Sequence, residues 1–100
     1  MSFHVRFTLE AKGDIERLYG FLVQRDFAAA ERALEVIEHA WSILEQFPFT
    51  CRKADDANPF LREFVISFGD SGYVALFEIE DSRTVTVLAV RHQLEDDYHR

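Results

Sequence analysis

Two amphipathic segments joined by a very short link constrain the fold of this chain most strongly. Over residues 9–25 and 28–46, hydrophobic residues recur at intervals of three and four, and charged residues fall between them. This spacing places the hydrophobic side chains on one face of an α-helix. Because only Asp26 and Phe27 form the link, we expect the two helices to pack as an antiparallel hairpin.

Three residues mark particular points of these helices. Thr8 precedes the first helix, where its hydroxyl can accept a hydrogen bond from a free amide of the first turn. Pro48 is expected to end the second helix, because the residue before a proline disfavours helical geometry. Gly20 lies inside the first helix and costs about 1 kcal/mol relative to alanine. We therefore expect a neighbouring backbone to approach closely at Gly20.

The rest of the chain has the spacing of β-strands. Residues 2–8, 64–68 and 73–79 alternate between the two faces of a strand, and residues 84–90 are β-branched and apolar on both faces. Residues 69–72 and 81–82 have the composition of turns. Residues 49–61 contain asparagine, proline and several charged residues, so we expect a loop there.

These elements predict one α+β domain over residues 1–100, with the order β-α-α-β-β-β. Hydrophobic residues make up 48% of the chain, which is enough for one core. The helix hairpin is expected to pack on one face of an antiparallel sheet, because no other part of the chain can cover that face. The other face is only partly apolar and is a candidate binding surface.

The composition also limits the classes of function. The formal net charge is −7, whereas proteins that grip nucleic acid usually present a basic face. The charge favours a protein partner with a basic surface. No segment has the length of a membrane span or the layout of a signal peptide, so we expect a cytoplasmic protein that does not bind membranes. Cys51 is the single cysteine, and the sequence predicts no metal or cofactor.

Two pairs of neighbouring residues are candidates for chemistry. Arg91 and His92 end the last predicted strand, where they can hold a phosphate or transfer a proton. Arg62 and Glu63 open an earlier strand, where the guanidinium can bind a phosphate or carboxylate. The local sequence favours plainer interpretations, a solvated strand end for the first pair and an exposed cross-strand ion pair for the second.

The ordered pattern as a whole resembles the RelE/ParE superfamily of bacterial toxins, and especially its ParE-like branch. The resemblance covers nearly the whole chain and depends on the set of segments rather than on one motif. Its segments are Glu10-Ala11, Asp14-Ile15, Ala29-Ala30, Ala33, Leu44, Phe47-Pro48, Leu61-Arg62-Glu63, Gly72 to Phe77, Val87 to Gln93, and Glu95.

The resemblance implies the toxin of a type II toxin–antitoxin system, with the fold described above. It implies a cognate antitoxin whose disordered segment folds onto the toxin, so that the two form a hetero-oligomer. It also implies a bacterial origin and a role in plasmid or prophage maintenance, or in stress arrest.

The superfamily contains two activities, and the resemblance favours one of them here. RelE-like members cut mRNA on the ribosome with basic residues on the sheet and near the C-terminus, whereas ParE-like members poison DNA gyrase. The corresponding sheet positions here are Val65, Ser67 and Val74, and Gln93 stands where a further arginine is common. These neutral residues favour gyrase inhibition, since phosphate chemistry needs positive charge.

Ribosome-dependent mRNA cleavage is the alternative, and a family member that only binds its antitoxin is a third possibility. In a nuclease, Arg91 would hold the phosphate and His92 or Tyr98 would move protons. For a gyrase inhibitor, no catalytic residue is expected, and the C-terminal segment is the stronger candidate for target contact. The residues predicted to contact the target are Arg62, Arg91, His92, Tyr98 and Arg100.

Overall fold

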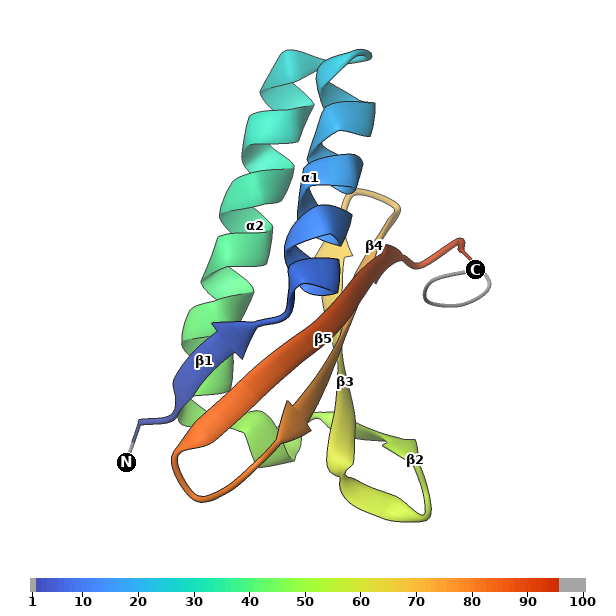
Figure 1. The fold of residues 1–100 in the computed structure, drawn as a ribbon. Coiled ribbons are helices and arrows are strands. Elements are labelled where there is room, and N and C mark those ends of the chain that lie inside the picture. The colour runs from blue at the N-terminus through green and yellow to red at the C-terminus, as the bar shows by residue number, and fades with distance from the viewer. Residues whose placement is uncertain (1, 96–100) are drawn as a thin grey trace.

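A computed structural model describes residues 2–95. The chain forms two α-helices, a short 3-10 helix and five strands, in an α+β arrangement that confirms the expected fold class (Figure 1). The elements are β1 (His4–Phe7), α1 (Leu9–Val23), α2 (Phe27–Gln46), η1 (Pro48–Thr50), β2 (Arg52–Asp55), β3 (Asn58–Phe68), β4 (Ser71–Ile79) and β5 (Thr84–His92).

The five strands form one sheet in the order β1-β5-β4-β3-β2, and the helix hairpin covers one of its faces (Figure 1). The pairs β2–β3, β3–β4 and β4–β5 are antiparallel, whereas β1 pairs with β5 in parallel. The sheet is therefore mixed, and the expectation of a purely antiparallel sheet is wrong at this edge. The reason is the hairpin, which returns the chain to the end where β1 begins. Strand β3 then runs in the same direction as β1. Because β4 runs opposite to β3 and β5 opposite to β4, β5 also runs in the same direction as β1.

The ends of the helices follow the local sequence. The Thr8 side chain accepts a hydrogen bond from the Ala11 amide at 3.1 Å, as predicted, and Asp26 caps α2 in the same way at the Ala29 amide. Helix α2 ends at Gln46, and Pro48 then begins η1. Both helices thus start at a side chain that satisfies an otherwise free amide of the first turn.

The structure corrects the expectation for Gly20. A Cβ atom added at this position would meet nothing within 4 Å, so no neighbouring backbone approaches the glycine. The structure instead requires glycine at Gly72, the second residue of β4, which has φ of +152°. A Cβ atom there would lie 2.0 Å from the carbonyl oxygen of Ile66.

The segment expected to be a loop contains strand β2 and the beginning of β3. In the β2–β3 register, Arg52 pairs with Glu63 and Lys53 with Arg62. All four residues of β2 are exposed, so this edge strand has no buried face and no alternation of hydrophobic residues. The prediction of a loop failed because that alternation is the signal by which strands are predicted.

The hydrophobic core lies between the hairpin and the sheet. The helices contribute several alanines, which allow close packing, and the strands contribute larger side chains such as Phe77, which is fully buried. Trp41 of α2 packs edge-to-face against Phe7 of β1, with ring centroids 5.1 Å apart. Neither of the two described helices is long and apolar enough to cross a membrane.

Candidate functional site: the C-terminal end of β5

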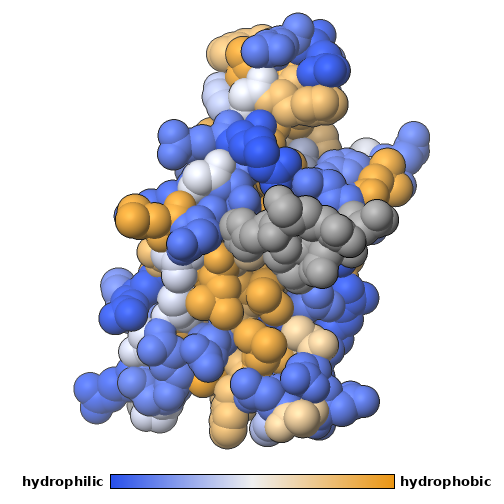
Figure 2. Space-filling view, turned by 45° about the vertical axis from the view of Figure 1, so that its right-hand side comes forward, coloured by the Kyte–Doolittle hydropathy of each residue, from blue (hydrophilic) through white to orange (hydrophobic). Residues whose placement is uncertain are grey.

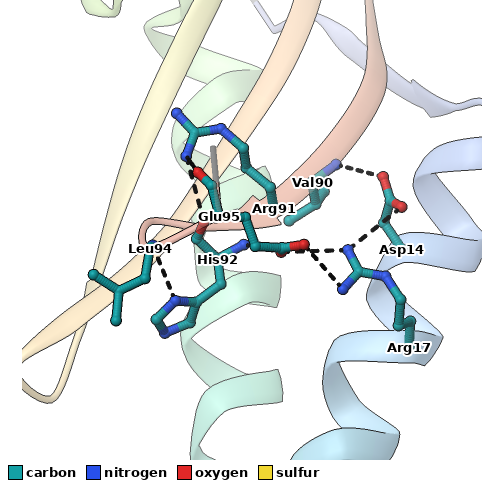
Figure 3. Close-up of polar contacts among 7 residues, drawn as sticks. All are labelled: Asp14, Arg17, Val90, Arg91, His92, Leu94 and Glu95. Atoms are coloured by element: carbon teal, nitrogen blue, oxygen red, sulfur yellow. Dashed lines mark hydrogen bonds and ion pairs between the residues drawn. The ribbon is translucent and has the colours of Figure 1, made fainter. Parts of the chain in front are cut away.

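The last part of β5 is held by helix α1. Strand β1 ends at Phe7, opposite Val87, whereas β5 continues to His92. Thr8 donates its amide to the Val87 carbonyl and its hydroxyl to the Leu88 carbonyl, both at 3.0 Å. Two residues further along β5, the Val90 amide donates to Asp14 Oδ2 at 2.9 Å (Figure 3). The beginning of α1 therefore satisfies the edge of β5 where no strand is paired with it.

Arg91 closes the turn that follows β5, and we call residues 91–95 the C-terminal turn. Its Nη1 donates to the Glu95 carbonyl at 2.9 Å and makes longer contacts of 3.4 Å with the carbonyls of His92 and Gln93. The Gln93 amide donates to the Gly72 carbonyl at 2.9 Å, which continues the pairing with β4. The guanidinium thus binds carbonyl oxygens of its own chain.

His92 makes its contacts with β4 and with the C-terminal turn. Its Nδ1 accepts a hydrogen bond from the Leu94 amide at 3.1 Å. A neutral ring with this acceptor carries its proton on Nε2, which donates to the Ser71 hydroxyl at 3.1 Å. The ring also packs edge-to-face on Tyr73, with centroids 5.6 Å apart. Both ring nitrogens therefore have partners within the domain.

Arg91 and His92 do not converge on one point. Successive residues of a strand face opposite sides of the sheet, and the two side chains diverge accordingly (Figure 3). His92 lies on the face of Tyr73, which is part of the core under the helices. Arg91 pairs in register with Val74. The structure does not bring these two predicted site residues into a common pocket.

Glu95 connects the C-terminal turn to α1. Its Oε1 accepts a hydrogen bond from the His92 amide at 2.8 Å, and its Oε2 lies 3.3 Å from Arg17 Nη1. Arg17 is also 3.8 Å from Asp14 Oδ1 (Figure 3). Burial alone would raise the pKa of Glu95, but the hydrogen bond from the His92 amide and the positive charge and hydrogen bond of Arg17 outweigh it. The pKa of this carboxyl therefore lies below its usual value.

Arg62 stands apart from this site. Its Nε donates to the Pro59 carbonyl at 2.6 Å, and its Nη1 donates to the carbonyls of Phe49 and Cys51 at 3.1 and 2.8 Å. The guanidinium thereby fixes the segment that precedes β3. Arg62 pairs with Phe77, four residues along β4 from the partner of His92, so the structure does not join it to the C-terminal turn.

Glu63, the neighbour of Arg62, forms the cross-strand ion pair that the local sequence predicts. Its carboxylate forms a cross-strand ion pair with Arg52 of β2, and the distance from Nε to Oε1 is 3.0 Å. Burial raises the pKa of the nearby Cys51 thiol, and the charge of Arg62 only partly offsets this. A thiol with a raised pKa is a poor nucleophile.

The sheet face opposite the helices carries neutral residues at its centre in β3 and β4, and Arg91 of β5 lies beside them. Val65 and Val74 pair directly across β3 and β4, and Ser67 lies two residues further on the same face. Val65 is 39% exposed and Val74 is buried. Figure 2 shows hydrophobic side chains gathered near the centre of the side it presents, with hydrophilic residues around them.

Two predicted contact residues, Tyr98 and Arg100, lie outside the described residues, and their roles stay predictions. The sequence interpretation missed Asp14, Arg17 and Ser71, which hold the end of β5. Asp14 was signalled only by the Asp14-Ile15 segment of the family resemblance, and Arg17 and Ser71 had no signal in the sequence. Among residues 2–95, no group of three or more histidine, cysteine, aspartate or glutamate side chains is arranged to hold a metal ion.

The chain matches one family model and two named bacterial toxins over most of its length. Residues 5–97 match the family model described as the ParE toxin of type II toxin–antitoxin system, parDE. The chain is 37% identical to Toxin RelE1 of Caulobacter vibrioides over 95 residues, covering 95% of this chain and 98% of the relative. It is 30% identical to Toxin RelE3 of the same organism over 86 residues, covering 85% and 88%.

Two solved structures share the fold. A chain from the chromosomal ParDE system of P. aeruginosa matches with a TM-score of 0.72 and 16% identity, covering 91% of this chain and 96% of that one. A chain from the RelBE2 toxin–antitoxin complex of Mycobacterium tuberculosis matches with a TM-score of 0.59 and 27% identity, covering 93% and 100%. The chain therefore belongs to the ParE/RelE family and is the toxin of a type II toxin–antitoxin system.

Proposed function

We propose that this toxin arrests growth by binding DNA gyrase and trapping the state in which gyrase has cleaved DNA, and that it does not cut RNA. The observation that carries the proposal is the divergence of Arg91 and His92 to opposite sides of the sheet, each with partners inside the domain. The family model, which bears the ParE name, supports the same branch.

Cleavage of a phosphodiester needs several groups at one point. A base must reach the attacking hydroxyl, and positive charge must stabilise the developing charge on the phosphate. In the described structure, the centre of the open sheet face is formed by Val65 and Val74, and the Arg91 guanidinium is bound to the carbonyls of the C-terminal turn. This arrangement favours attachment to a target over chemistry on RNA.

The charge of the chain supports a protein target. A net charge of −7 opposes binding to a polyanion, because most nucleic-acid affinity comes from cations that displace counterions. The same charge attracts a partner with a basic surface and raises the rate of association with it.

We further propose that the antitoxin covers hydrophobic surface of this toxin. Phe49 and Phe60 are both about half exposed and pack against each other with centroids 6.3 Å apart. Exposed apolar clusters of this kind are typical of protein interfaces. An amphipathic segment of the antitoxin would bury such residues as it folds. The large hydrophobic residues that the structure leaves exposed are Leu9, Phe21, Phe27, Phe47, Phe49, Phe60, Val65 and Leu94.

Co-expression with the product of the adjacent gene tests this partner. We expect a stable complex that protects the cell from growth arrest. A toxin that stays monomeric in the presence of that product would contradict the proposal.

The second candidate function is ribosome-dependent mRNA cleavage. The relatives that match over most of the chain are named RelE toxins, and Arg91, His92 and Tyr98 are the residues that would carry the reaction. This alternative requires Arg91 or His92 to exchange its present partners for RNA.

One experiment separates the candidates. The toxin is expressed without its antitoxin, mRNA 5′ ends are mapped in the arrested cells, and purified toxin is added to a gyrase supercoiling assay. We expect inhibited supercoiling and an unchanged pattern of mRNA ends. New codon-linked ends with normal supercoiling would support the ribonuclease, and the absence of growth arrest would show an inactive toxin that only binds its antitoxin. The matched control is the purified toxin–antitoxin complex at the same concentration.

A further inference from the structure

We propose that Arg17 is a positioning residue for toxicity: through Glu95 it fixes the orientation of the C-terminal turn against α1. The proposal rests on the proposed function, gyrase inhibition, and on the expectation from the sequence that the C-terminal segment contacts the target. It assigns no target contact to Arg17 itself.

An ion pair between Arg17 of α1 and Glu95 of the C-terminal turn joins the two segments. Arg17 Nη1 lies 3.3 Å from Glu95 Oε2, and Nη2 lies 3.4 Å from Oε1. The two nitrogens of one guanidinium thus face the two oxygens of one carboxylate, an arrangement that fixes direction as well as distance. Asp14, one turn earlier in α1, lies 3.8 Å from Arg17 Nη2 and orients the arginine (Figure 3).

The carboxylate that Arg17 holds also closes the C-terminal turn. Glu95 Oε1 accepts the His92 amide at 2.8 Å, and the Glu95 amide donates to the His92 carbonyl at 3.0 Å. Further hydrogen bonds of the turn come from its own arginine and from β4. Arg17 therefore ties the turn directly to the helix layer, and this tie fixes the position of Glu95 at the end of the described residues.

The exposure of the pair separates positioning from stability. The side chains of Arg17 and Glu95 are 51% and 38% exposed, and ion pairs this exposed contribute little to the stability of a fold. The core that holds the domain together lies elsewhere, between the hairpin and the sheet. Loss of the pair is therefore expected to loosen the turn while the domain stays folded.

The test is a double-mutant cycle of Arg17→Gln and Glu95→Gln in the full chain, with Arg17→Lys as the conservative variant. The matched control is Arg6→Gln, which removes the Arg6–Glu80 ion pair of 3.6 Å with side chains 57% and 36% exposed. Growth arrest and gyrase inhibition are measured for each variant. Antitoxin binding, thermal unfolding and amide exchange of Gln93 and Glu95 are measured alongside them.

We expect each glutamine variant to need roughly two- to five-fold more toxin for the same growth arrest, the equivalent of one exposed ion pair. The double variant should lose no more than either single variant, because both remove the same contact. Arg17→Lys should restore part of the loss. Amides of the turn should exchange faster in Arg17→Gln, whereas its thermal unfolding should change only by the small amount expected of an exposed ion pair. Antitoxin binding and the Arg6→Gln control should match the wild type.

Wild-type growth arrest in Arg17→Gln would overturn the proposal. So would additive losses in the double variant, or an equal loss of thermal stability and antitoxin binding, which would make Arg17 structural. If the wild-type toxin does not inhibit gyrase but growth arrest still follows the pattern above, the target assignment fails and the role of Arg17 stands.

Discussion

Replacement of Asp14 tests whether α1 holds the unpaired edge of β5. The Val90 amide donates to Asp14 Oδ2 at 2.9 Å, and the Asp14 side chain is only 12% exposed. In Asp14→Ala the amide loses this partner at a position where water has little access. Hydrogen bonds to charged groups contribute about 1.5–3 kcal/mol. We expect Asp14→Ala to lower the free energy of unfolding by about 2 kcal/mol.

For a domain of this size, 1 kcal/mol corresponds to a shift in Tm of roughly 4–8 °C. Asp14→Ala should therefore lower Tm by about 8–16 °C. Asp14→Asn keeps an acceptor but loses the charge, and a neutral hydrogen bond is roughly half as strong as a charged one. It should lose about 1 kcal/mol. Glu16→Ala, at an exposed position of the same helix, is the control and should stay within about 0.5 kcal/mol of the wild type.

Thermal and urea unfolding followed by circular dichroism measure these differences, and amide exchange at Val90 locates them. Exchange at Val90 should rise most in Asp14→Ala. Equal stability of Asp14→Ala and the wild type, or an asparagine variant as unstable as the alanine variant, would refute the role given to this hydrogen bond.

Three further predictions follow from single positions. Gly20→Ala should raise the free energy of unfolding by up to about 1 kcal/mol, because the added methyl group meets nothing and alanine favours the helix. A lower free energy of unfolding in urea titrations would contradict the claim that there is room for a side chain at this position. Gly72→Ala should destabilise the fold and lower Tm, because its Cβ would lie 2.0 Å from the Ile66 carbonyl oxygen; an unchanged Tm would show that the turn yields easily. The lowered pKa of Glu95 means that its ionised form stabilises the fold above its usual pKa of 4.5. The difference in unfolding free energy between wild type and Glu95→Gln should therefore disappear as pH falls through the lowered value. If the difference in unfolding free energy between the two proteins instead grows as pH falls, the contacts with Arg17 do not stabilise the ionised form of Glu95.

The helices and the central strands were predictable because their hydrophobic spacing reports burial directly. The hairpin, the Thr8 cap and the strands from Phe64 to Val90 follow from it. Strand β2 was not predictable, because an edge strand with four exposed residues has no alternation. The parallel pairing of β1 depends on which edge of the sheet it joins, and that choice is made by tertiary packing.

The candidate site was predictable only in part. Spacing alone indicated that Arg91 and His92 end a strand, and period-two alternation places neighbours on opposite faces. The contacts of Arg62 with distant carbonyls and the tie from Arg17 to Glu95 join residues far apart in sequence. Exposed charged residues of an amphipathic helix give no local signal of such partners.

The central claim is that the toxin acts by binding its target and performs no phosphodiester chemistry. Its most direct test incubates purified toxin with gyrase and plasmid DNA, and in parallel with ribosomes translating a defined mRNA. We expect linear plasmid covalently attached to gyrase and an intact mRNA. Cleaved mRNA that becomes intact when Arg91 or His92 is replaced, with no gyrase-linked DNA, would contradict the account.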